Sequence, residues 1–269
     1  MADVLYQKQD HIAYVTFNRP DNKNTWTAES FVILADAWQD IQNDSAIRAA
    51  ILTGSGGEAF SAGGDLGSLI PLFTGAKQAQ TDAEKRFMQD LETYTNRAVL
   101  KDFECYKPII AAVNGVALGG GFEILQCADI RVAARGVKMG LPEVKRALVP
   151  GAGSLVRLIR QLSHARAMEM LLTGEMFSAE QLLEWGFLNY IVEPDQLMAK
   201  AQQLAATIVA NGPLAVQACK EAALRSQTLD WEQAFAVERA LSAKVMASAD
   251  AREGPAAFKE KRSPVYTGN

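Results

Sequence analysis

Short apolar runs bounded by polar or glycine-containing turns recur through residues 1–195. Each run has the length and the bounding residues of a strand. The runs are Val4 to Lys8, Ile12 to Phe17, Ala49 to Thr53, Pro108 to Val113, Ile130 to Ala134, Val137 to Met139 and Tyr190 to Val192. Between the second and third runs, apolar residues at spacings of three and four predict an amphipathic helix: Phe31, Leu34, Trp38 and Ile41. Strand, helix and strand in this order indicate a crossover unit with strands buried on both faces.

The segment from Gly67 to Tyr106 interrupts this alternation. A polar stretch around Gly75 is followed by apolar residues that share one face of a single predicted helix: Phe87, Leu91, Tyr94 and Ala98. We expect the first part of this segment to be mobile and to cover a site, because long irregular connections in compact domains often have that role.

Helical patterns dominate from about Phe177 onward. Three residue pairs have the spacing of a capping box: Ser178 with Gln181, Asp230 with Gln233, and Asp250 with Glu253. Two apolar faces follow, formed by Leu197, Ala201, Leu204 and Ile208 and by Trp231, Phe235, Leu241 and Val245. No sheet is predicted beneath these helices, so their apolar faces need a partner, and another subunit is a natural one.

The bulk properties are those of a globular protein. The chain has 269 residues, a hydrophobic content of 49% and a charged content of 22%, enough for one large domain or a domain with an appendage. Its net charge is −4. An acidic balance argues against nucleic acid as the main partner, since phosphate binding depends on clustered Lys and Arg.

The cysteines and the N-terminus bear on the compartment. Cys105, Cys127 and Cys219 are scattered and lack metal-ligand spacing, so we expect buried thiols in a reducing compartment and no disulfide framework. The first residues show no basic region leading into an apolar one, hence no secretory signal. The sequence therefore predicts a cytoplasmic protein without a membrane segment.

The stretch from Lys107 to Asp129 carries the most specific chemistry. A buried strand is followed by Gly119, Gly120 and Gly121, which begin a predicted helix. The first N–H groups of a helix lack intrahelical partners and attract negative charge, so these glycines expose donors suited to an anionic oxygen. Glu123 lies among apolar neighbours, where an ionised carboxylate is costly unless it is paired or catalytic. A purely structural role at the helix N-terminus stays open for it.

Two other interpretations of this stretch fail. Its uncharged part is shorter than the roughly 20 residues that a bilayer requires, and it contains the polar residues Asn114, Glu123 and Gln126. Its glycines also lack the Gly-x-Gly-x-x-Gly order of a dinucleotide-binding turn.

A second glycine turn follows an earlier run, at Ser61-Ala62-Gly63-Gly64-Asp65-Leu66. Alone it is equally compatible with a plain tight turn, and Glu143, which follows Pro142, suits the first turn of a helix as well as catalysis. Together, two such turns could direct two N–H donors at one oxygen while Glu123 and Glu143 move protons on neighbouring carbons. This set suits a carbonyl compound that develops enolate charge, and no Ser-His-Asp series, metal cluster or phosphate loop competes with it.

Four ordered blocks resemble the signature motifs of the crotonase, or enoyl-CoA hydratase/isomerase, family. They are Ser61-Ala62-Gly63-Gly64-Asp65-Leu66, Asn114-Gly115-Val116-Ala117-Leu118-Gly119-Gly120-Gly121-Phe122-Glu123, Leu141-Pro142-Glu143 and Pro150-Gly151-Ala152-Gly153. The similarity runs through nearly the whole chain and includes Phe258-Lys259-Glu260-Lys261-Arg262. The motifs are specific for the family and far less specific for the substrate.

The resemblance implies an α/β fold in two parts. A crotonase-type spiral of ββα repeats would cover residues 1–195 and contain the acyl-CoA site, and residues 196–269 would form a C-terminal helical trimerisation region. Two trimers often stack as a hexamer in this family. The substrate is an acyl-CoA thioester, and neither a separate cofactor nor a metal is implied.

The resemblance also implies roles for individual residues. The backbone N–H groups of Gly64 and Gly120 would hold the thioester oxygen, and Glu123 and Glu143 match the acid/base carboxylates of the hydratases. Members with both carboxylates typically add water across the 2,3 double bond, which favours an enoyl-CoA hydratase with syn addition. We assign Glu123 to deprotonating water and Glu143 to delivering a proton to C2.

The expected CoA contacts are less specific. Ala62, Asp65 and Leu66 lie where family members line the adenine and pantetheine path, and Phe258 and Lys261 match a block that reaches CoA, sometimes across a subunit boundary. Packing or a solvated charge explains each of these residues equally well.

Other activities stay open on sequence grounds. A double-bond isomerase, or a related dehydratase or epimerase, is the main alternative, and an RNA-binding role attributed to one branch of the family conflicts with the acidic balance. The segment between Leu66 and Pro108 is longer than in short-chain hydratases, and Ser154 stands where a glycine is frequent. The acyl chain and the pathway are therefore not specified.

Overall fold

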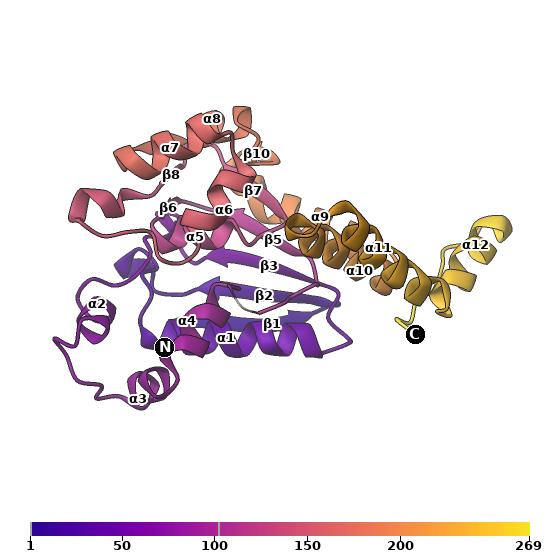
Figure 1. Cartoon of the computed structure of the whole chain (residues 1–269), viewed down its shortest axis with the longest axis horizontal. Coiled ribbons are helices and arrows are strands. Elements are labelled where there is room, and N and C mark those ends of the chain that lie inside the picture. Colours follow the sequence, from indigo (N-terminus) through magenta and orange to yellow (C-terminus); the bar gives the residue numbers. More distant parts are fainter. Residues whose placement is uncertain (1, 102) are drawn as a thin grey trace.

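A computed structural model of the chain describes residues 2–101 and 103–269. Its strands form a six-stranded sheet, in the order β1-β2-β3-β5-β7-β10, and a four-stranded sheet, in the order β4-β6-β8-β9 (Figure 1). The larger sheet contains β1 (Val4–Gln9), β2 (Ile12–Phe17), β3 (Ala49–Gly54), β5 (Ile109–Val113), β7 (Ile130–Ala134) and β10 (Tyr190–Val192). The smaller sheet contains β4 (Ala59–Ser61), β6 (Val116–Leu118), β8 (Lys138–Gly140) and β9 (Met176–Ser178).

The first two strands form an antiparallel hairpin, as predicted. Its two-residue turn, Asp10 and His11, has φ of 50° and 66°, and positive φ at both positions matches the twist of a tight hairpin. From β2 to β10 all pairings in the larger sheet are parallel. Every residue of β3 and β5 is buried, which explains their continuous apolar sequences.

Between β3 and β8, successive strands along the chain belong alternately to the larger and the smaller sheet. β3, β5 and β7 belong to the larger sheet, and the strand after each of them, β4, β6 and β8, belongs to the smaller one. Repetition of this step produces the predicted spiral of ββα units. The three-residue strands β4, β6 and β9 are not predicted by the sequence pattern, because so short a run cannot be told from the turn beside it.

Helices cover both sheets and extend beyond them. Those before β9 are α1 (Ala28–Asn43), α2 (Leu69–Phe73), α3 (Asp82–Gln89), α4 (Leu91–Ala98), α5 (Gly120–Leu125), α6 (Ser154–Gln161) and α7 (His164–Thr173). Those after it are α8 (Ala179–Glu184), α9 (Leu197–Val209), α10 (Pro213–Arg225), α11 (Trp231–Met246) and α12 (Asp250–Glu260). Short 3-10 turns are η1 (Pro20–Asn22), η2 (Pro142–Arg146), η3 (Pro194–Gln196) and η4 (Ser226–Thr228). No helix in the described part of the chain has both the length and the apolar character needed to cross a bilayer.

The C-terminal helices differ in their relation to the core. α9 packs against β3, β5 and β7, and α10 is joined to the ends of the sheet by Lys220, whose Nζ donates to Lys107 O and pairs with Asp129. α12 extends away from the sheets (Figure 1). No residue of α11 is buried in the single chain, and the side chain of Trp231 is 80% exposed. The predicted helical region is present, and its role in trimerisation stays a prediction.

Several local predictions were wrong. The single helix predicted through Phe87 and Ala98 is two helices, because Asp90 leaves helical geometry (φ −140°, ψ 59°) and caps α4 by accepting a hydrogen bond from Thr93 N. Cys219 is exposed rather than buried.

The capping boxes have mixed outcomes. Ser178 and Gln181 form the predicted box, and Asp230 accepts a hydrogen bond from Gln233 N. Asp250 is already helical and instead accepts hydrogen bonds from the backbone N–H groups of Thr267 and Gly268. The third cap was therefore wrong.

Candidate active site

One cavity of about 910 Å³ brings the predicted site residues together. Its lining includes both glycine turns and both predicted carboxylates, together with three of the expected CoA residues: Gly64, Gly120, Glu123, Glu143, Ala62, Asp65 and Leu66. Phe258 and Lys261 are not part of it. They belong to the end of α12, far from the sheets (Figure 1), where the Phe258 side chain is 87% exposed.

In the first glycine turn, pairing of the neighbouring residues with Trp26 leaves the N–H of Gly64 unpaired with that residue. Trp26 N donates to Gly63 O (2.8 Å), and Asp65 N donates to Trp26 O (2.9 Å), so Gly64 forms an isolated parallel bridge with Trp26. Successive N–H groups of an extended segment point in opposite directions. The Gly64 N–H therefore points away from Trp26.

The second glycine turn exposes an amide because a helix begins there. Gly119 precedes α5, and its carbonyl accepts hydrogen bonds from Phe122 N (2.8 Å) and Glu123 N (2.9 Å). The N–H of Gly120, in the first turn, has no acceptor within the helix. A Cβ atom on Gly63 would lie 2.8 Å from Gly120 N, so the two turns touch, and Gly64 and Gly120 both line the cavity.

Two further glycines allow this close approach. A Cβ atom on Gly121 would lie 2.1 Å from Ser61 O, which is impossible without moving one turn away from the other. Gly119 has φ of 54°, a conformation that disfavours side chains, and its Cβ would lie 2.8 Å from Glu143 Oε1. The second turn thus lies directly against the Glu143 carboxylate.

Glu123 is almost completely buried on α5, with 2% of its surface exposed. Its Oε1 accepts a hydrogen bond from Ser154 N at 3.0 Å. Burial raises the pKa of Glu123, and hydrogen bonds from the backbone of Ser154 and Ala152 partly oppose that rise. Glu123 lies in the first turn of α5, and its hydrogen bond joins it to the first residue of α6, so the structural role at a helix N-terminus stays open beside a catalytic one.

Glu143 lies on η2 on the other side of the second glycine turn. Burial, together with the negative charge of Glu123, raises the pKa of Glu143 to about 7. Its Oε2 is buried and has no hydrogen-bond partner among the described residues. A buried carboxylate oxygen without a partner is uncommon in stable structures and is typical of a functional site.

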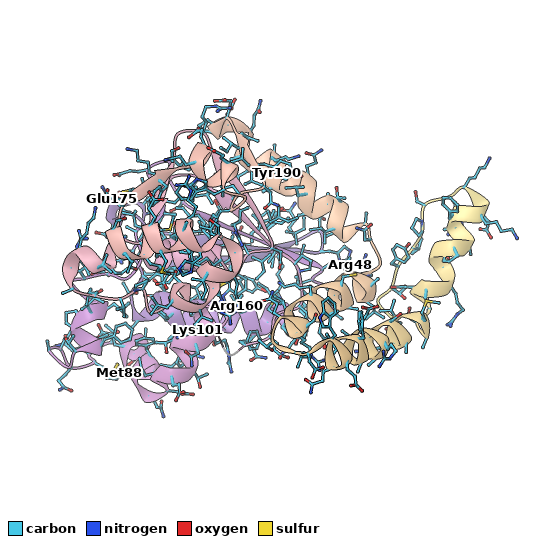
Figure 2. All side chains as sticks on the ribbon, turned by 45° about the horizontal axis from the view of Figure 1, so that its top comes forward. Arg48, Met88, Lys101, Arg160, Glu175 and Tyr190 are labelled. Carbon is cyan, nitrogen blue, oxygen red and sulfur yellow. The ribbon has the colours of Figure 1, made fainter. Side chains whose placement is uncertain are left out.

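The segment between Leu66 and Pro108 borders the cavity, as expected. Its apolar contribution comes from Leu69, Ile70, Phe73 and Val99, and its polar contribution from Thr95, Asn96 and Lys101. Phe31 of α1 packs edge-on against Phe73, with ring centroids 6.5 Å apart. Lys101 follows α4. In the view of Figure 2 it lies between α3, which carries Met88, and α6, which carries Arg160. The mobility expected for this segment stays a prediction.

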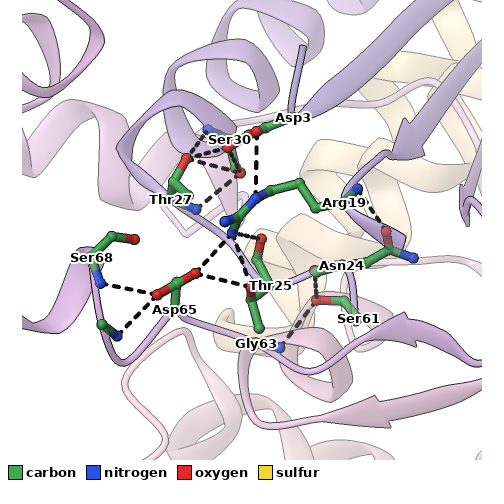
Figure 3. Close-up of polar contacts among 11 residues, drawn as sticks. Asp3, Arg19, Asn24, Thr25, Thr27, Ser30, Ser61, Gly63, Asp65 and Ser68 are labelled. Atoms are coloured by element: carbon green, nitrogen blue, oxygen red, sulfur yellow. Dashed lines mark hydrogen bonds and ion pairs between the residues drawn. The ribbon is translucent and has the colours of Figure 1, made fainter. Parts of the chain in front are cut away.

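A polar network holds the first glycine turn in place (Figure 3). Arg19 Nη1 donates to Asp65 Oδ2 at 3.0 Å, and Thr25 Oγ1 donates to the same oxygen at 3.2 Å. The other oxygen of Asp65 accepts hydrogen bonds from the backbone N–H groups of Gly67 and Ser68. Burial acts to raise the pKa of Asp65, but these hydrogen bonds, that of Arg19 foremost, outweigh burial and lower it.

This network changes the interpretation of Asp65. Its carboxylate is occupied by partners within the protein, so its side chain anchors the loop, and only its position in the cavity wall matches the CoA contact that was expected. Sequence reasoning missed Arg19, which lies in a segment interpreted as a loop. A cation in the loop between β2 and η1, with its acidic partner 46 positions later, leaves no local signal in the sequence.

The enoyl-CoA hydratase/isomerase family matches residues 7–269 of the chain. The chain is 40% identical to "Enoyl-CoA hydratase EchA19" of Mycobacterium tuberculosis, over 98% of this chain and 96% of that protein. It is 37% identical to "Carnitinyl-CoA dehydratase" of Salmonella typhi, over 96% and 95%. The crystal structure of enoyl-CoA hydratase EchA1 from Mycobacterium marinum superposes with a TM-score of 0.87 at 38% identity and covers 100% of both chains.

Proposed function

The chain belongs to the enoyl-CoA hydratase/isomerase family, and on that premise we propose that it is an enoyl-CoA hydratase, adding water syn across the 2,3 double bond of an acyl-CoA thioester. One observation carries the proposal. Two glycines from the two turns and two glutamates, one buried and one half-buried, line a single cavity: Gly64, Gly120, Glu123 and Glu143. The reaction needs donors at the thioester oxygen and proton-transfer groups at C2 and C3, and this set has both.

The amides of Gly64 and Gly120 would act as an oxyanion hole. Attack of water at C3 pushes electrons onto the thioester oxygen, which becomes enolate-like in the transition state. Donors fixed at that oxygen stabilise the transition state more than the ground state, by about 3 kcal/mol for each donor. Because the two turns lie in close contact, these amides would need little reorganisation during the reaction.

The two carboxylates would divide the proton transfers. With a pKa of about 7, Glu143 is partly protonated at neutral pH, which suits an acid that delivers a proton to C2. Glu123 receives a hydrogen bond from Ser154 N that favours its ionised form, which suits a base that takes a proton from water. Because each charge affects the other group, the titration belongs to the pair.

The CoA moiety would run along the first glycine turn, past Ala62 and Leu66. Phe258 and Lys261 are outside the cavity of their own chain, so they would reach CoA only from a neighbouring subunit. A homotrimer, alone or stacked as a hexamer, would satisfy this requirement and cover the exposed face of α11. We propose a cytoplasmic enzyme with no cofactor apart from the CoA of its substrate.

A related dehydratase is the second candidate, because one relative is named carnitinyl-CoA dehydratase. Dehydration is the same reaction in reverse and would use the same two carboxylates. Isomerisation of a 3-enoyl-CoA to a 2-enoyl-CoA needs a proton to leave C2 and another to be added at C4. Incubation of a 3-enoyl-CoA in deuterated water separates an isomerase from both hydro-lyases, since an isomerase gives a deuterated 2-enoyl-CoA without the 3-hydroxy product.

The direct test is turnover of crotonyl-CoA by Glu123→Gln and Glu143→Gln, followed as loss of the enone absorbance. We expect kcat to fall by about 10²-fold or more in each variant while CoA binding persists. Glu169→Gln is a matched control, because Glu169 pairs with Arg166 on the exposed face of α7. Full activity in either site variant would refute the assignment.

A further inference from the structure

Lys101 is a cavity-lining cation that the proposed chemistry does not use. Its Nζ donates to the carbonyl oxygen of Gly151 at 3.2 Å, and its side chain lines the same cavity as Glu123. Among the described residues, no carboxylate lies within ion-pair distance of this ammonium group. A charged donor with a single neutral acceptor retains hydrogen-bonding capacity for a ligand.

Two other cations line the cavity. Lys23 Nζ forms an ion pair with Glu58 Oε1 at 2.9 Å. Arg146 lies on η2 with Glu143, and its charge opposes the rise in the pKa of that carboxyl. Lys101 instead lies on the wall formed by the turn after α4 and the loop at Gly151.

The backbone around Lys101 is shaped to present it. Leu100 has φ of 52°, which is unusual for a residue with a bulky side chain. Its carbonyl accepts a hydrogen bond from Arg157 Nη2 at 2.5 Å, and Lys101 N donates to Asn96 O at 2.8 Å. Two fixed contacts thus hold the strained turn that directs the lysine from the end of α4 toward Gly151.

On the proposed function, the acyl chain would extend toward Lys101. Gly151 leads directly to Ser154, whose N–H holds Glu123, and the charge of Lys101 helps to stabilise the ionised form of Glu123. Glu123 is proposed to act at C3, so a cation beside it faces atoms beyond C3. The turn proposed for CoA is a different wall, anchored through Asp65 and Arg19.

We propose that the preferred substrates carry a carboxylate on the acyl chain beyond C3, and that the ammonium group of Lys101 binds it. This inference rests on the proposed hydratase function and specifies its substrate class. The hydrocarbon between C3 and the carboxylate would pack against Phe31, Phe73 and Val99. A charge-assisted hydrogen bond in such a partly apolar cavity is stronger than one on an open surface.

The test compares esters that differ only at the end of the acyl chain. One pair is 2-pentenoyl-CoA and 4-carboxybut-2-enoyl-CoA, and a longer pair is 2-hexenoyl-CoA and 5-carboxypent-2-enoyl-CoA. The measured quantity is the ratio of kcat/KM for the acid to that for the neutral ester. Any contact between Lys101 and a CoA phosphate is common to both esters and cancels in this ratio.

The wild-type enzyme should favour the acid in at least one pair. Lys101→Met should lower the ratio by about 10- to 100-fold, the range expected for one hydrogen bond between charged groups. Lys101→Glu should lower it further by repulsion. Lys85→Met is the control, because Lys85 is exposed on α3 and pairs only weakly with Asp82, so its ratio should equal that of the wild type.

Two results would overturn the proposal while leaving the hydratase function intact. One is a wild-type preference for the neutral ester in both pairs. The other is an equal effect of Lys101→Met on acid and neutral esters, which would make Lys101 a positioning residue for Glu123 or a CoA contact. Absence of hydration with all four esters would overturn the hydratase function itself.

Discussion

Two walls of the cavity differ in composition: one consists mainly of main-chain atoms and the other of side chains. The backbone wall, residues 61–65 and 119–123, consists of two glycine turns whose main chains touch, with Gly63 and Gly121 closest to the opposite turn. The helical wall, residues 69–73 and 95–101, presents side chains from α2, α4 and the turn after α4. The backbone wall can bind the thioester that all acyl-CoA esters share. The side chains of the helical wall can be substituted to suit different acyl groups with little effect on the stability of the fold.

The largest expected effect comes from breaking the backbone wall with Gly121→Ala. The added Cβ would lie 2.1 Å from Ser61 O, so the turns must separate. We expect kcat to fall by about 100-fold and the free energy of unfolding to fall by about 1–3 kcal/mol. Gly57→Ala is the control, because its Cβ would meet no atom within 4 Å. Equal kinetics and equal melting curves for both variants would show that contact between the turns is unimportant.

A smaller effect is expected from loosening the same wall without a steric clash. Arg19→Met removes the donor to Asp65 that anchors the first turn. We expect kcat to fall by about tenfold with little change in KM, because the Gly64 amide loses alignment but the cavity remains. Lys145→Met, which breaks the exposed ion pair with Glu175, serves as the control. A rise in KM at constant kcat would instead make this network part of CoA binding.

The pH dependence probes the carboxylate beside the backbone wall. If Glu143 must be protonated, kcat should fall by about tenfold per pH unit above its pKa of about 7. The variant Glu143→Asp should retain a falling alkaline limb at a different pH. If substitutions of Glu143 leave the fall of kcat at high pH unchanged, another titrating group causes that fall.

The same pKa has a consequence for stability. The folded-state pKa of Glu143 is raised above its unfolded value, so the folded state binds the proton more tightly, and this contribution is lost as pH rises from the unfolded value through about 7. The free energy of unfolding of Glu143→Gln should therefore rise relative to the wild type between pH 5 and pH 8. Chemical denaturation at both pH values measures the difference.

The smallest effect is expected in the helical wall. Phe73 is 42% exposed and packs against Phe31 and Phe87. Phe73→Ala should change the ratio of kcat/KM for decenoyl-CoA to that for crotonyl-CoA by about fivefold, with kcat for crotonyl-CoA nearly constant. Met88→Ala, on α3 outside the cavity lining, is the control. A loss of kcat with every ester would contradict the claim that the helical wall affects only the preference for the acyl chain.

The difference between the walls also explains what could be predicted from sequence. The backbone wall requires glycine where main chains approach each other, so Gly64, Gly120 and Glu123 stand out in the chain and all line the cavity. The helical wall depends on packing between segments. The break at Asp90 and the left-handed Leu100 arise from contacts of α4 with its surroundings, which a helical periodicity does not record.

Long-range polar contacts escaped prediction for a similar reason. The Arg19–Asp65 pair joins two loops, and each residue alone has the composition of an ordinary turn. Phe258 and Lys261 lie outside the cavity of their own chain, so their contact with CoA stays a prediction.

The most direct test of the central claim is a crystal structure with acetoacetyl-CoA, which has no double bond to hydrate. We predict that its thioester oxygen lies about 2.7–3.1 Å from both Gly64 N and Gly120 N, with the carboxylates of Glu123 and Glu143 beside C2 and C3. A thioester oxygen that contacts neither amide, or a ligand carbon chain remote from both glutamates, would contradict the account.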